Sequence, residues 1–139
     1  MKLNRLAAVA TAATLTFAGV AVAGPAEAAP RKPGVVVDYA YHTIKQKPKT
    51  IRPYKDVFYS NVRWTSLTKT TGSATATRNV NTCVPSCAEG NYKKTKVKLK
   101  FNRVRLSDCR KVFSRVKVTV IKTKKTYAHP LPVFAASDC

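Results

Sequence analysis

The chain has 139 residues, and 26 Lys and Arg residues against six Asp and Glu residues give it a formal net charge of +20 at pH 7. Such a charge lies far outside the range of an ordinary small domain and indicates contact with anions. No apolar run of about 18 residues follows residue 28, so no membrane-spanning helix is expected in the rest of the chain.

Residues 1–28 have the three parts of a removable secretory signal peptide. Lys2 and Arg5 give a positive start, and the uncharged stretch Leu6–Ala23 follows. Ala26-Glu27-Ala28 places small residues before a cleavage site at Ala29, with Ala21-Val22-Ala23 as the alternative site. The alternative is an uncleaved membrane anchor, but the stretch is Ala-rich and barely long enough to span a bilayer. We therefore expect a secreted protein, either free outside the cell or associated with the cell wall.

Cleavage after residue 28 would leave 111 residues, which suit one domain, with 24 basic and five acidic residues and a net charge of +19. The predicted organisation of this part is a flexible basic arm at 29–34, a β domain at 35–123, and a C-terminal tail at 124–139 tied back by a disulfide.

Short β-branched and aromatic runs between turn-forming residues predict about six strands, and no stretch shows helical periodicity. The expected strands are Val35–Tyr41, a short edge strand around Thr50–Arg52 between prolines, Val57–Leu67, Ala74–Val80, the run from Lys94 to Phe101, and Val112–Thr123. The predicted fold class is all-β, a small antiparallel sandwich or open barrel.

The clearest pattern is a period-two alternation of apolar and basic residues in the last two of these runs, which predicts a long antiparallel hairpin with one buried and one wet face. A phase shift near Asn102-Arg103 would be explained by a bulge. The predicted core consists of Phe58, Val62, Trp64, Val97, Leu99, Phe101, Val116, Val118 and Val120.

All four cysteines follow the signal segment, and an even number in an exported chain predicts two disulfides. Four cysteines allow three pairings. We favour Cys83–Cys87, which closes a short loop, and Cys109–Cys139, which ties the tail to a turn. A zinc site is the alternative, but it would need clustered histidines, and no metal or other cofactor is expected.

Several segments form a recognisable pattern together. They are Pro48-Lys49-Thr50-Ile51, Val62-Arg63-Trp64-Thr65-Ser66-Leu67, Ala74-Thr75-Ala76-Thr77, the loop Cys83-Val84-Pro85-Ser86-Cys87-Ala88-Glu89-Gly90, and Val97 with Phe113 in the hairpin. With them, residues 48 to about 120 resemble a group of small secreted actinobacterial proteins of unknown function, in which the C-x-P-x-C-A-x-G loop is the specific part.

The resemblance implies secretion and a β fold, and it implies no activity. Relatives often carry a cysteine near the positions of Arg52–Tyr54 and a second tryptophan near that of Leu67, whereas this chain has Cys109 and Cys139 instead. Because the loop cysteines recur while their companions vary, the resemblance also supports the pairing of Cys83 with Cys87.

From Lys93 to Lys125 there are 14 Lys or Arg residues and one acidic residue, Asp108. The cations expected to share the outward face of the hairpin are Lys94, Lys96, Lys98, Lys100, Arg115 and Lys117. Like charges repel across a sheet, so we interpret this face as a site for a polyanion, either nucleic acid or a phosphate-bearing or acidic wall polymer. The alternative is a solvated lysine face on a structural or protein-interaction module.

The residues that could transfer a proton near neutral pH are few, and no nucleophile motif is present. His42 and His129 are the only histidines, Glu89 lies in the cysteine loop, and His129 precedes a proline in the tail. The sequence therefore predicts a protein that is not an enzyme and has no catalytic residues. A small secreted hydrolase or inhibitor is the third interpretation.

Overall fold

The computed structural model describes residues 31–135, and every regular element in this part is a strand. The strands are β1 (Val35–Asp38), β2 (Tyr41–Lys45), β3 (Ile51–Tyr54), β4 (Val57–Leu67), β5 (Gly72–Asn81), β6 (Tyr92–Ser107), β7 (Arg110–Val120) and β8 (Thr126–Pro130). The signal peptide predicted at 1–28 and the predicted disulfide partner Cys139 lie outside the described residues.

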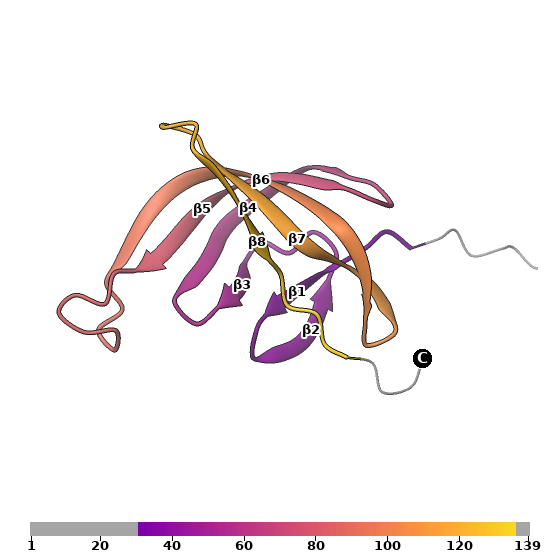
Figure 1. The fold of residues 1–139 in the computed structure, drawn as a ribbon, viewed down its shortest axis with the longest axis horizontal. Helices are drawn as coiled ribbons and strands as arrows, with labels where there is room; N and C mark the ends of the chain where they lie inside the picture. Colours follow the sequence, from indigo (N-terminus) through magenta and orange to yellow (C-terminus); the bar gives the residue numbers. More distant parts are fainter. Residues whose placement is uncertain (1–30, 136–139) are drawn as a thin grey trace, which may run out of the picture.

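The eight strands form one sheet in the order β2-β1-β3-β4-β5-β6-β7-β8. Neighbouring strands are antiparallel except β1 and β3, which pair in parallel through Asp38 and Arg52. The sheet curls into a half-barrel in which β4–β7 arch over β1–β3 (Figure 1). The predicted all-β fold class is therefore confirmed, and of the two predicted forms, a sandwich or an open barrel, the structure has the open barrel, with eight strands in place of about six.

The curl is joined at one end by a bridge between the start of β1 and the start of β7. The Gly34 N–H donates to the Lys111 carbonyl at 2.9 Å, and the Phe113 N–H donates to the Gly34 carbonyl at 3.0 Å. Gly34 and the preceding Pro33 are both buried, so the packed part of the chain begins before β1.

The structure has strands where the sequence predicted otherwise in two places: one run expected to be a single strand contributes to two strands, and the expected C-terminal tail contains a strand. The run 35–41 turns at Tyr39-Ala40, where the Ala40 N–H donates to Asp38 Oδ1 at 2.9 Å, and so divides into β1 and the start of β2. The tail supplies β8, which pairs with β7 from Thr119 opposite Thr126 to Arg115 opposite Pro130.

The expectation that the strand around Thr50–Arg52 lies at a sheet edge is wrong. This strand is β3, and it lies between β1 and β4. Its register against β4 shifts between Ile51 and Tyr54. Pro53 falls inside that irregular part, so its missing N–H interrupts no regular ladder of hydrogen bonds.

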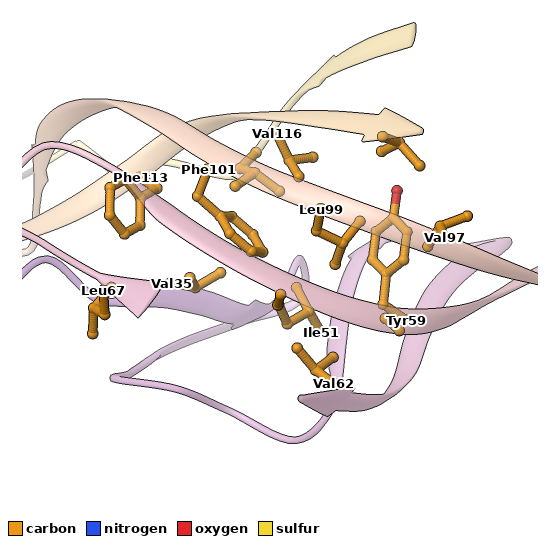
Figure 2. Close-up of a cluster of buried hydrophobic side chains, with 14 residues drawn as sticks. Val35, Ile51, Tyr59, Val62, Leu67, Val97, Leu99, Phe101, Phe113 and Val116 are labelled. Atoms are coloured by element: carbon orange, nitrogen blue, oxygen red, sulfur yellow. The ribbon is translucent and has the colours of Figure 1, made fainter. Parts of the chain in front are cut away.

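The hydrophobic core lies on the concave face of the arch, above β1 and β3 (Figure 2). Eight of the nine predicted core residues belong to it, with Trp64 and Val120 partly buried at its margin. The prediction that Phe58 belongs to the core is wrong, because the neighbouring Tyr59 is buried instead and is only 1% exposed. The register of β4 against β5 shifts between Ser60 and Arg63, so a strict period of two does not hold along this strand.

Aromatic rings pack closely around Phe101. Trp64 stacks on it with ring centroids 4.7 Å apart, and Phe113 lies 5.9 Å away on the neighbouring strand. Gly72, directly opposite Phe101, leaves room for these rings, because a Cβ there would lie 2.9 Å from Trp64 Cζ3. The Trp64 Nε1–H donates to the Pro48 carbonyl at 3.0 Å, which fixes the ring at the margin of the core.

The predicted phase shift in the hairpin is present, but no extra residue causes it. Phe101 pairs with Val116 and Val104 with Phe113, so both strands change phase together and the register stays unbroken. Arg103 between them has a positive φ of 54°, and its carbonyl accepts a hydrogen bond of 2.7 Å from Ser114 Oγ. A left-handed residue therefore takes the place of the expected bulge.

The predicted Cys83–Cys87 disulfide is confirmed. The Asn81 side chain hydrogen-bonds to both ends of the disulfide loop: its Nδ2 donates to the Cys87 carbonyl at 2.8 Å, and its Oδ1 accepts from the Cys83 N–H at 3.1 Å. Cys109 lies in the two-residue turn between β6 and β7, and no described cysteine is a free thiol. The pairing of Cys109 with Cys139 stays a prediction.

Candidate anion-binding face

Four of the predicted anion-binding residues project from the convex face of β6. The core takes Val97, Leu99 and Phe101 on the concave side, and successive side chains of a strand point to opposite faces. The alternate residues are Lys94, Lys96, Lys98 and Lys100, and all four are exposed. Because alternate residues of a strand are about 7 Å apart, these lysines form a line of charge about 20 Å long.

The other two predicted residues come from β7 and lie beside this line. Lys117 is directly opposite Lys100, and Arg115 is opposite Asn102. Directly opposed side chains have Cβ atoms about 4.5–5.5 Å apart, so the Lys100 and Lys117 charges repel each other. The six residues therefore share one face of two adjacent strands, as the alternation predicted.

Hydroxyl-bearing side chains border the lysines on the neighbouring strand β5. Ser73, Thr75 and Thr77 lie opposite Lys100, Lys98 and Lys96, respectively. The Lys96 Nζ donates to Thr77 Oγ1 at 3.1 Å, which holds that ammonium close to the sheet. The face can thus offer both ammonium and hydroxyl donors to an oxyanion.

Arg63 on β4 extends the same face, although it was not among the predicted site residues. It lies opposite Thr75. Its alternation with Trp64 was a usable signal, but only the strand order places it beside the lysines. Two shallow hollows follow these strands, one of about 420 Å³ that includes Lys98, Lys100 and Lys117, and one of about 400 Å³ that includes Arg63 and Lys96.

The charges of this face have no carboxylate partners in the part of the chain that the structure describes. Residues 31–135 contain 24 Lys and Arg residues and four Asp and Glu residues. The ion pair found among them joins His42 Nδ1 to Asp108 Oδ2 at 3.4 Å, in the region of the β6–β7 turn. Since no Lys or Arg of this part pairs with a carboxylate, the positive field remains available to an external anion.

A second group of polar side chains lies on the concave side and was missed by sequence reasoning. Arg78 shares the strand face of Ala74 and Ala76, and its guanidinium lies 5.3 Å from the centroid of the Tyr127 ring. Burial raises the pKa of Tyr59 to about 12, and the nearby Arg78 charge offsets part of that rise. The pairing of β5 with β4 brings Arg78 and Tyr59 opposite each other.

His129 belongs to this concave group rather than to a loose tail. Its ring meets Tyr127 edge-on at 5.1 Å and Tyr54 at 6.3 Å, and the Tyr54 hydroxyl donates to the neighbouring Pro130 carbonyl at 2.6 Å. Burial, together with the Arg78 charge, lowers the pKa of His129 below its ordinary value of 6.5. The neutral imidazole is therefore the favoured form in the folded protein.

Replacing His129 with glutamine should make protein stability fall less steeply as the pH is lowered from neutral to mildly acidic values. The unfolded chain takes up the His129 proton near pH 6.5, before the folded chain does, so wild-type stability falls as the pH drops from there through the folded-state pKa. Thermal unfolding of His129→Gln, wild type and the control His42→Gln between about pH 7.5 and pH 5 measures this. Parallel declines in all three proteins would contradict the assignment.

The three residues considered for proton transfer lie in different surroundings. His42 stacks on Phe134 with ring centroids 3.7 Å apart, His129 lies in the concave group, and Glu89 is exposed in the cysteine loop. Within residues 31–135, no three His, Cys, Asp or Glu side chains gather where they could hold a metal ion. The same part of the chain has no helix with the length and apolarity needed to cross a membrane.

Comparison of the chain with models of protein families, with curated proteins and with solved structures yields no match.

Proposed function

We propose that this protein is a secreted β domain that binds anionic polymers through the convex face of β4–β7. The observation that carries the proposal is the set of Lys and Arg side chains on that face, of which Lys100 and Lys117 lie directly opposite each other and none pairs with a carboxylate of the described residues. Repulsion within such a face costs stability, and a bound polyanion would remove that cost.

The proposed recognition depends on charge rather than on bases or sugars. The most exposed aromatic side chains, Tyr39, Tyr41 and Tyr54, come from β2, β3 and the β1–β2 turn and not from the convex face. Tyr92, which precedes Lys94 on the same face of β6, is half-buried and packs edge-on against Phe58 with ring centroids 5.2 Å apart, so the face has no row of open rings on which successive bases could stack. The line of charge about 20 Å long suits a polymer that carries an anionic group at every repeat.

Secretion is part of the same proposal. The signal-peptide pattern supports it, and so does the Cys83–Cys87 disulfide, because disulfides persist in oxidising compartments outside the cytosol. Membership of the secreted group that the cysteine loop resembles is proposed on the same grounds.

Retention of the mature, oxidised protein on immobilised heparin and on double-stranded DNA tests the binding proposal. We expect retention at about 0.15 M salt, with a log affinity that falls linearly with log salt by about 0.9 for each phosphate contact on DNA. Elution from both matrices well below that salt concentration would leave the alternative, a structural or interaction module whose lysines serve only solubility.

A further inference from the structure

A hollow of about 360 Å³ opens on the concave side of the sheet, at the end of β5 where the apolar core stops. Val97 and Val120 form the last apolar row of β6 and β7. In the next rows of β5 and β6, Arg78 lies opposite Thr95, and Val80 lies opposite Lys93. All of these side chains except Val97, together with the Tyr127 ring, line the hollow.

Arg78 enters this hollow as a cation without a counter-ion in the described part of the chain. The side chain is half-buried, and its Nε is buried without a hydrogen-bond partner. The Tyr59 side chain, directly opposite on β4, and the Tyr127 ring both interact with the guanidinium but do not neutralise it. Because a buried Nε–H without a hydrogen-bond partner and a half-buried charge without a counter-ion both cost free energy, the arrangement favours a ligand that accepts hydrogen bonds and carries negative charge.

We propose that this hollow binds a phosphate or similar tetrahedral oxyanion group. The Arg78 guanidinium would supply a fork of donors, Lys93 a second charge, and the Thr95 hydroxyl a further donor. Val80, Val120 and the Tyr127 ring would contact an apolar group next to the anion. The volume lies within the range of small-molecule sites.

The inference does not rest on the proposed function, because the hollow and the cationic face lie on opposite sides of β5 and β6. The oxyanion could belong to a small phosphomonoester or to the end of a polymer chain. Both sources present the same group to Arg78 and Lys93, so the experiment must separate them.

Titration of the isotope-labelled mature protein with inorganic phosphate, followed by NMR, tests the inference. We expect saturable shifts at the amides of Arg78, Lys93 and Thr95 with a Kd of about 1 mM or below. Arg78→Gln and Lys93→Gln should each weaken binding by about tenfold or more. Arg63→Gln removes one charge from the convex face and should change the Kd less than about twofold.

Lys93 lies exposed at the rim of the hollow, so Lys93→Gln should fold normally. The test therefore remains decisive even if Arg78→Gln does not fold. Tighter binding of phenyl phosphate than of inorganic phosphate would support a small-molecule ligand. Tighter binding of an oligothymidylate with a 5′-phosphate than of the same oligomer without one, lost in Lys93→Gln, would support a polymer end.

Absence of saturable shifts, or an equal loss in Arg63→Gln, would overturn the inference. Neither result would affect the convex face, because heparin retention reports on that face separately.

Discussion

Replacing Phe101 with alanine should lower the free energy of unfolding by about 3–5 kcal/mol. The ring is 1% exposed, lies between Trp64 and Phe113, and faces the gap that Gly72 leaves in β5. Its removal opens a cavity that these rigid neighbours cannot fill. Since a domain of this size has a stability of about 5–15 kcal/mol, the variant should be close to the limit of folding.

Chemical denaturation of the oxidised protein measures this loss, with Leu106→Ala as the matched control on the same strand. Leu106 is 57% exposed, and its truncation should change the free energy of unfolding by no more than about 0.5 kcal/mol. Equal losses in the two variants would mean that the aromatic group is not the centre of the core.

Replacing Lys94, Lys96, Lys98 and Lys100 together with glutamine should weaken binding to double-stranded DNA by about 10²–10³-fold at low salt. Each lost contact with an anionic surface is worth on the order of 1 kcal/mol. The slope of log affinity against log salt should become shallower by about 4, because up to four fewer counterions are released. The fold should persist, since all four side chains are exposed and alternate with the core residues of β6.

A variant with the same loss of charge separates a localised face from a general effect of net charge. Lys45, Lys49, Lys55 and Lys69 are exposed and lie in β2 or in connections outside strands β4–β7, so the glutamine variant of these four should retain most of the binding. If the two quadruple variants lose affinity equally, the proteins bind through overall charge and the proposed face is wrong.

The long hairpin and its lysine face were predictable because both depend on local alternation. Val97, Leu99 and Phe101 each follow a lysine, and a strand places such neighbours on opposite sides whatever the rest of the chain does. The same reasoning failed at Phe58, because register shifts in β4 interrupt the alternation and a single sequence does not mark where they fall.

The concave group could not be predicted, because it depends on strand order. Arg78 appears in the sequence as one more cation of a basic chain, and only the pairing of β5 with β4 and of β8 with β7 brings it near Tyr59 and Tyr127. The inner position of β3 has the same origin. The proline in this strand suggested a position at the edge of the sheet, but β1 pairs with β3 in parallel and so lies on the side that would otherwise be the edge.

The bridge between Gly34 and Phe113 also bears on how the molecule forms. It joins the first packed residues to the seventh strand, so the contacts that complete the curl are among the most distant in the chain. Bringing such distant segments together costs chain entropy before any contact compensates, which makes assembly slow. A nascent chain that ends before β7 cannot join the curl, so the molecule stays open until residues 110–113 have been synthesised, whatever hairpins the earlier strands have already formed.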